Sequence, residues 1–389
     1  MMEMLMGVLL ALAGLPVLYL LATVIAPLVQ RSRPPSTTPP RRIAILVPAH
    51  DEALLIADTV GNLQQQRYTA EAMQVVVIAD NCTDETAAIA AASGARVIER
   101  QGNPGKGQGL FDALNLLLQE DWDAFLIVDA DSHLHPEALA EINQALAAGS
   151  RAIQMRYGVL NPEQSLRTRA MELSTASYNA LRPLGKSVLN ISAGINGNGF
   201  CITRETAVQV PYLAHSIVED IEYHMHLLAA GIKVDFLDHV WVKAQMPIGG
   251  RGATVQRVRW ERGRILTIRQ YAPQLLRALF AGQRRAIDGL IDVLMPPVSL
   301  IFLALLLPAL FGGAVQQMLG VAGLLVMGAH YLIAAVRYGN FRWFVILIGY
   351  VPWYVVWKTW VVLSSMLTER QLPWMRTDRH AHKDTDSHN

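Results

Sequence analysis

The sequence predicts an α/β domain with a doubly wound sheet, inserted between helices that cross a membrane. Two observations lead to this prediction. Between residues 42 and 275, short apolar runs suited to buried strands alternate with helical patterns, and long stretches without charged side chains come before and after this region. Alternating strands and helices form a parallel sheet covered by helices. An uncharged stretch of about 20 residues is long enough to cross a bilayer.

The first uncharged stretch covers residues 4–29, which is 26 residues. A cleaved signal peptide is the alternative interpretation, but no basic residue precedes the apolar run and several follow it. These are Arg31, Arg33, Arg41 and Arg42. We therefore expect an uncleaved transmembrane anchor at 4–29, a proline-rich linker at 30–41 and a cytoplasmic location for the domain that follows.

The second uncharged stretch, 293–336, has 44 residues without Asp, Glu, Lys or Arg and is long enough for two spans divided at 312–317. A third apolar stretch, 344–357, is interrupted by Lys358. Basic residues on both sides of it predict that it is re-entrant or does not cross. The expected order is an amphipathic interfacial segment at 276–290, membrane and interfacial helices at 291–368 and a polar tail at 369–389.

The central region predicts strands at 43–50, 73–80, 95–100 and 123–130, separated by helices at 51–66, 84–94 and 110–119. In a doubly wound sheet, ligands bind at the carboxyl ends of the strands. Polar side chains follow the predicted strands at that edge: His50, Asp51 and Glu52; Asp80, Asn81 and Asp84; Lys106 in a glycine-rich loop; and Asp129 with Asp131.

The chemistry of this edge narrows the ligand. Two carboxylates as close as Asp129 and Asp131 repel each other unless a cation, a proton or hydrogen-bond donors lie between them. The loop GNPGKG lacks the spacing of a nucleoside-triphosphatase loop, and no GxGxxG follows the first strand. We expect a nucleotide with phosphates, held by Mg²⁺ or Mn²⁺ on the aspartates and by Lys106. The net charge of +1 gives no indication of a nucleic-acid partner.

Two later segments carry further candidates. Residues 217–231 predict a helix that opens with Glu219 and Asp220, which either complement the helix N-terminus or supply a base for an incoming hydroxyl. His224 and His226 are two residues apart, so they do not share a helix face as a metal pair would. The two cysteines, Cys82 and Cys201, are expected to be free thiols.

The segment VQRVRWERG, 255–263, combines Gln256, Arg259 and Trp260. A guanidinium suits a diphosphate leaving group and an indole suits stacking on a sugar or lipid acceptor. An amphipathic helix whose arginines meet lipid headgroups is the alternative, and the two are compatible. Between residues 251 and 285 there are nine arginines and a single acid, Glu261.

These motifs resemble the membrane-bound family 2 glycosyltransferases, the group that contains cellulose, hyaluronan and chitin synthases. The resemblance is carried by VPAHDE at 47–52, Asp80, DAD at 129–131, VED at 218–220 and QRVRW at 256–260. It implies a cytoplasmic GT-A domain at 42–275. It also implies roles for individual residues: Asp220 as catalytic base; Asp51, Asp80, Lys106, Asp129, Gln256 and Arg259 for the nucleotide sugar; Gly199, Phe200, Glu219 and Trp260 for the acceptor; and Asp131 with Asp129 for the metal.

The resemblance implies a metal-dependent, inverting hexosyltransferase. It would move a sugar from a UDP-sugar to a membrane lipid or lipid-linked saccharide, in polysaccharide or glycolipid synthesis at the bacterial inner membrane. The Q-x-x-R-W motif favours a processive polysaccharide synthase, whereas the few spans favour single addition. A nucleotide-binding regulator anchored in the membrane and without activity is the alternative from another class. The sequence leaves the donor sugar, the acceptor, the linkage and the oligomeric state open.

Overall fold

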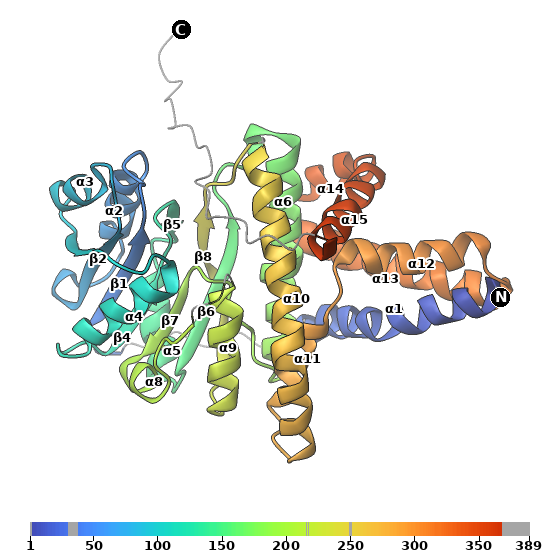
Figure 1. Ribbon diagram of the computed structural model, residues 1–389, viewed down its shortest axis with the longest axis horizontal. Helices are drawn as coiled ribbons and strands as arrows, with labels where there is room; N and C mark the ends of the chain where they lie inside the picture. The colour runs from blue at the N-terminus through green and yellow to red at the C-terminus, as the bar shows by residue number, and fades with distance from the viewer. Residues whose placement is uncertain (1, 30–37, 215, 217, 249–250, 368–389) are drawn as a thin grey trace, which may run out of the picture.

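The computed structural model describes residues 2–29, 38–214, 216, 218–248 and 251–367. It has an eight-stranded sheet covered by helices and, beside it, a group of long apolar helices that project away from the sheet (Figure 1). The linker residues 30–37 and residues 368–389, which include the whole predicted tail at 369–389, lie outside the described residues.

The first half of the sheet is parallel, as the sequence predicts. Its strands are β1 (Ile43–Ala49), β2 (Met73–Asp80), β3 (Arg96–Arg100) and β4 (Ala124–Ile127). They lie in the order β3-β2-β1-β4, and each neighbouring pair is parallel. Along β1, Ile43 and Ile45 pack into the core on one face of the sheet, and Ala44 and Leu46 pack into the core on the other. Burial on both faces explains why this strand is apolar at every position rather than at alternate ones.

The second half of the sheet is mixed, which extends the parallel arrangement predicted from the first four strands. Its strands are β5 (Ser132–Leu134), β6 (Ala152–Val159), β7 (Phe200–Thr203) and β8 (Val234–Ala244). β7 runs antiparallel between β4 and β6, and β5 is antiparallel to β8 at the sheet edge. Because Phe200 pairs with Ile127, the residues just before β7 lie beyond the carboxyl end of β4. The reversed strand therefore brings the loop at 190–199 to the edge where the sequence predicts a ligand.

Helices cover both faces of the sheet. One face carries α2 (Ile56–Gln64), α3 (Thr86–Ala92) and α5 (Ala138–Ala147). The other face carries α4 (Lys106–Leu117), α7 (Arg182–Val188), α8 (Arg204–Gln209) and α9 (Glu219–Ala229). α6 (Leu166–Ala176) continues through a π-helical turn, Ser177–Leu181, into α7. Two helices of the second face contact the helices outside the domain, since α7 packs on α1 (Met2–Ile25) and α9 packs on α11 (Ala286–Leu294).

Two described helices are long and apolar enough to cross a membrane, α1 (Met2–Ile25) and α13 (Ala314–Arg337). Two further pairs meet that test only together and are bent, α11 (Ala286–Leu294) with α12 (Val298–Phe311) by 70° and α14 (Phe341–Ile348) with α15 (Val351–Leu367) by 80°. α1, α12 and α13 run side by side (Figure 1). The division between α12 and α13 falls at 312–313, where the sequence predicts it.

α10 (Arg251–Phe280) lies between the sheet and the apolar helices, and its axis crosses theirs (Figure 1). The segment 276–290, predicted from the sequence to be interfacial, holds the end of α10, a turn and the start of α11. α15 packs on α10, and Lys358 Nζ lies 2.5 Å from Glu261 Oε1. The lysine that interrupts the last apolar stretch is thus buried and paired with Glu261. The bend before α15 fits a broken span as well as a re-entrant segment, so the topology of this stretch stays a prediction.

Candidate active site

The carboxyl ends of β1, β2 and β4 meet at one edge of the sheet, and the predicted polar residues gather there. Asp80 ends β2, while Asp51 and Asp129 follow β1 and β4 by two residues. Lys106 was expected within a loop but is the first residue of α4. α4 therefore starts at this edge, and the helical backbone sets the direction of the Lys106 side chain.

Asp80 is almost completely enclosed by protein, with its side chain 9% exposed. Its carboxylate accepts hydrogen bonds from the Arg100 guanidinium, from Asn81 Nδ2 at 2.8 Å and from the backbone N–H of Gly105 at 2.9 Å. These bonds hold the turn that precedes Lys106 against the end of β2. Asp80 therefore fixes where α4 begins.

Asp51 has a left-handed backbone, with φ of 53°. Its carboxylate accepts from the Thr83 N–H at 2.7 Å, from Thr83 Oγ1 at 3.1 Å and from the Asp84 N–H at 3.2 Å. The bond from the Thr83 backbone lowers the pKa of Asp51. With Cys82 and Asp84 it brings three potential ligand atoms within 4.8 Å among the described residues. The carboxylate oxygens of Asp51 already accept hydrogen bonds from the loop at residues 83–84. Burial raises the pKa of the Cys82 thiol, and a thiol suits a hard cation poorly. We therefore interpret these three residues as holding the loop in place rather than as a metal site.

Lys106 connects the two sides of the site. Its Nζ lies 2.5 Å from Asp129 Oδ1, 2.6 Å from the Gly197 carbonyl oxygen and 3.8 Å from Glu219 Oε1. Burial lowers the pKa of Lys106, but the charges of Asp129 and Glu219 outweigh it and the net shift is upward. The ammonium is therefore a fixed positive charge between one carboxylate on the sheet and another on α9.

α9 opens with the two acids singled out by the sequence. Burial raises the pKa of Glu219 to about 7 and raises the pKa of Asp220, and Lys106 opposes both shifts. A Cβ atom placed on Gly197 would lie 3.3 Å from Asp220 Oδ2, and the φ of Gly197 is 70°. The backbone at Gly197 thus lies against Asp220 while its carbonyl oxygen binds Lys106, and only a glycine fits there without strain.

Asp129 and Asp131 offer oxygen ligands at the end of β4. Asp129 is about one-third exposed, and Asp131 Oδ1 accepts a hydrogen bond from Ser132 Oγ at 3.0 Å. The Asp131 carbonyl oxygen also accepts from the Gln245 N–H at 3.0 Å, which fixes the turn to the end of β8. Carboxylate oxygens fit Mg²⁺ or Mn²⁺, and a cation bound here would compete with Lys106 for Asp129.

Two buried amides position this turn, and the sequence analysis did not identify either. Asn198 Oδ1 accepts from the Asp129 N–H at 3.1 Å, and Asn198 Nδ2 donates to Ser132 Oγ at 2.8 Å. Gln154 Nε2 donates to the Asn198 carbonyl oxygen at 2.9 Å, and Gln154 Oε1 accepts from the Asn196 N–H at 3.0 Å. The sequence does carry one signal for Gln154, because it is a polar residue among the apolar residues that begin β6.

The structure corrects the acceptor role expected for Gly199 and Phe200. The Phe200 side chain is fully buried in the core, stacked 6.4 Å from the ring of Tyr212, so it has no surface for an acceptor. The Gly199 N–H and carbonyl are used in sheet bonds to Ile127 and Met155. In the motif GNGF it is the first glycine, Gly197, that faces the carboxylates.

The side chains of Gln256, Arg259 and Trp260 lie outside the described residues, while their backbone belongs to α10. One turn further along α10, a Cβ on Gly263 would lie 2.5 Å from Val218 Cγ1. Val218 directly precedes Glu219. α10 therefore runs close past the start of α9, within about one helical turn of the predicted motif.

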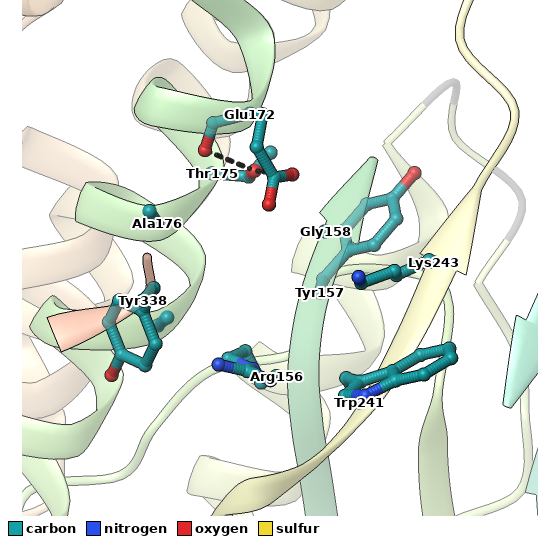
Figure 2. Close-up of a pocket in the computed structure, with 10 residues that line it drawn as sticks. Arg156, Tyr157, Gly158, Glu172, Thr175, Ala176, Trp241, Lys243 and Tyr338 are labelled. Carbon is teal, nitrogen blue, oxygen red and sulfur yellow. Dashed lines mark hydrogen bonds between the residues drawn. The ribbon is translucent and has the colours of Figure 1, made fainter. Parts of the chain in front are cut away.

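A small cavity of about 50 Å³ lies apart from the carboxylates, between β6, β8 and α6. Figure 2 shows Arg156 and Lys243 on the strands, Glu172 and Thr175 on the helix, and Tyr338 beyond the end of α13. Arg156 lies 4.9 Å from the ring centre of Tyr338. The cavity lies at the junction between the sheet and the apolar helices.

An α/β domain joined to apolar helices, with acids and a lysine gathered at the carboxyl edge of its sheet, defines a glycosyltransferase of the GT-A fold. The model of the family described as glycosyltransferase-like family 2 matches residues 39–263, more than half of the chain, and this chain belongs to that family.

Individual relatives are distant. A probable glycosyltransferase from Bacillus subtilis, YdaM, is 24% identical over 61% of this chain and 58% of its own length. A beta-monoglucosyldiacylglycerol synthase from Synechocystis is 25% identical over 59% of this chain and 49% of its own length. The matches thus span about half the length of these relatives. The solved mannosyltransferase PcManGT from Pyrobaculum calidifontis, in complex with GDP-Man and Mn²⁺, has a TM-score of 0.56 at 18% identity and covers 93% of this chain and 99% of that chain, so the two share a fold.

Proposed function

We propose that this chain is an inverting, metal-dependent hexosyltransferase that moves a sugar from a UDP-sugar to a membrane lipid or lipid-linked saccharide. The transferase domain would be residues 42–275, held at the cytoplasmic face of a bacterial inner membrane by the anchor at 4–29 and the helices at 291–368. Family 2 membership establishes the enzyme class, and the donor, the acceptor and the stereochemistry are the proposed part.

The observation that carries the proposal is the position of Lys106 between two groups of acids. On one side it contacts Asp129, beside the proposed metal ligand Asp131, and on the other it faces Glu219 and Asp220. A charged diphosphate needs cations where negative charge develops, and an attacking hydroxyl needs a base on the opposite side of the sugar. We assign the first requirement to Lys106 and the second to Asp220.

In the proposed mechanism, Asp220 removes the proton from the acceptor hydroxyl as its oxygen attacks the anomeric carbon. The bond from that carbon to the diphosphate breaks in the same displacement, and the configuration inverts. A base works best when its pKa approaches the working pH, and burial moves the pKa of Asp220 in that direction. Lys106 and Arg259 stabilise the leaving diphosphate. A bound Mg²⁺ or Mn²⁺ on Asp129 and Asp131 would supply further positive charge to it.

The remaining assignments follow the same division of the site. Asp51, Asp80 and Gln256 would bind the nucleotide part of the donor, and Glu219 and Trp260 would line the acceptor side. A lipid acceptor is supported by the apolar helices beside the domain and by the long helix α10 between the two. The name of the Synechocystis relative, a diacylglycerol glycolipid synthase, points to the same acceptor class.

The test uses the full chain purified in detergent and returned to vesicles with extracted bacterial lipids. A panel of labelled UDP- and GDP-sugars is added with Mn²⁺, and the products are identified by mass. We expect one sugar on a lipid, lost in Asp220→Asn while the donor still binds. A ladder of products would instead indicate a processive synthase. Donor binding without any transfer or hydrolysis would indicate a regulator, and near-normal turnover in Asp220→Asn would refute the assignment of the base.

A further inference from the structure

A second group of charged side chains is buried behind the site. Lys186 of α7 is 0% exposed, and its Nζ lies 2.6 and 2.7 Å from the two carboxylate oxygens of Asp292 on α11. The same ammonium donates to the Ala193 carbonyl oxygen at 3.2 Å. The Arg182 guanidinium lies 3.7 Å from Asp292. A buried ion pair of this kind adds little net stability over apolar packing, so a role other than stability is worth seeking for it.

His224 joins this pair to the loop before β7. His224 Nε2 lies 2.9 Å from Ser192 Oγ, and His224 Nδ1 lies 3.6 Å from Asp292 Oδ2. Ser192 Oγ already accepts from the Val234 N–H at 3.0 Å, so its proton is free to be donated to the imidazole. Burial lowers the pKa of His224 to about 4. The ring is therefore neutral, with Nδ1–H turned toward Asp292.

The network links α11 to two segments that carry active-site residues, α9 and the loop before β7. His224 lies one helical turn after Asp220 on α9. Ser192 lies five residues before Gly197, whose carbonyl binds Lys106. α11 holds the same loop a second time, because Asp288 Oδ2 accepts the Ser192 N–H at 3.0 Å. Through its 70° bend, α11 continues into the apolar helix α12.

We infer that Lys186 and His224 are positioning residues that hold the helix of Asp220 in register with the loop of Gly197, through Asp292 of α11. The inference rests on the proposed function of Asp220. Asp80 and Asp129, in contrast, are fixed by the parallel strands and by Asn198. Loss of the network should therefore displace the base relative to the donor without removing the donor site.

The first test is a set of substitutions on α9. His224→Leu keeps the side-chain bulk but removes both polar contacts, whereas His224→Gln can still accept from Ser192 and donate toward Asp292. We expect His224→Leu to lower kcat about tenfold or more, with the Kd and KM of the donor within about twofold of wild type, and His224→Gln to restore most of kcat. His226→Leu is the matched control. His226 lies on the same helix as His224, its ring centre is 6.5 Å from that of Tyr271 on α10, and the variant should have wild-type kcat.

The second test removes the charges of Lys186 and Asp292 together. Lys186→Met alone would strand the Asp292 carboxylate and disturb folding, so the double variant Lys186→Met with Asp292→Asn is compared with wild type. Because Asp292→Asn also leaves the Arg182 guanidinium without this carboxylate, we expect a lower thermal unfolding midpoint as well as a kcat lower by about tenfold. Wild-type kcat in a folded double variant would mean that the pair serves structure alone, which overturns the inference. If the double variant does not fold, the His224 series decides.

Three outcomes in the His224 series also overturn the inference: an unchanged kcat in His224→Leu, a loss of donor binding that parallels the loss of kcat, or a failure of His224→Gln to exceed His224→Leu. The proposed function fails separately. If the wild-type chain binds donor but transfers no sugar, the activity assignment is wrong, and this is known before any variant is made.

Discussion

Lys106 Nζ lies 2.5 Å from Asp129 Oδ1 and 2.6 Å from the Gly197 carbonyl oxygen, which ties the first turn of α4 to the end of β4 and to the loop before β7. This one ammonium compensates three acids, because Glu219 and Asp220 also face it. Buried carboxylates without such a partner would become protonated. The charge state of the site therefore depends on Lys106.

Replacing Lys106 with methionine should lower kcat by about 10²–10³-fold, since a positive charge beside the leaving group is lost. The pKa values of Glu219 and Asp220 should rise further, so the acid limb of the pH–rate profile should move to higher pH. Lys233→Met, which removes a lysine outside the site, is the control. A profile that keeps its position in Lys106→Met would contradict the proposed coupling.

Gly107 should not tolerate a side chain, although it lies in a helix where alanine is normally favourable. An added Cβ would lie 1.9 Å from the backbone oxygen of Ala214, which cannot move without moving the loop before α9. Gly107→Ala should lower the free energy of unfolding by about 1–3 kcal/mol. Gly109→Ala, whose Cβ would meet Ile78 Cγ2 at an ordinary 3.5 Å, should be neutral or stabilising. Thermal unfolding midpoints of the two variants, equal within error, would refute the steric argument.

Glu219 should make stability depend on pH. Its pKa is raised from 4.5 to about 7, so the folded state favours the protonated form. The stabilisation that protonated Glu219 gives to the folded state is fully present below pH 4.5 and is lost as the pH rises through 7. Above pH 7, Glu219→Gln should therefore be more stable than wild type by on the order of 1–3 kcal/mol, and the difference should vanish near pH 4. Unfolding midpoints from pH 4 to 9 test this, with the exposed Glu205→Gln as a control that shows no trend.

Removal of the metal should affect donor binding through Asp131. We expect chelation by EDTA to abolish transfer and added Mn²⁺ or Mg²⁺ to restore it. Asp131→Ala should weaken the Mn²⁺-dependent part of UDP binding at least tenfold, because one of two carboxylate ligands is lost. Asp121→Ala, at an exposed acid beside Arg42, should bind as wild type does. Calorimetric titration with and without Mn²⁺ measures both, and identical affinities in Asp131→Ala and wild type would exclude this residue as a ligand.

Much of the fold could be predicted because its first half obeys local rules. Apolar runs such as 43–49 are buried on both faces of the sheet, and the helices between them are amphipathic. The mixed second half could not be predicted in the same way. β5 and β7 have only three and four residues, and the direction of so short a strand is decided by its neighbours rather than by its own pattern.

Some residues of the candidate site could likewise be predicted from the sequence, and others could not. The acids at strand ends, Asp80 and Asp129, are visible in the sequence because they interrupt apolar runs. Phe200 was misplaced because a motif shows which residues are adjacent in the chain, but not which way each side chain points. Asn198 and Gln154 were not identified because the role of a buried polar residue becomes clear only once its partners are known.

By itself the sequence determined the class of fold, the apolar helices and the acids that end the strands, since composition and periodicity express burial directly. Only the tertiary structure decided that Lys106 joins Asp129 to Glu219, that Gly197 rather than Gly199 faces Asp220, and that Lys358 is paired with Glu261. Each of these contacts joins residues far apart in the chain. Such contacts depend on how strands pair and helices cross, and no local pattern encodes that.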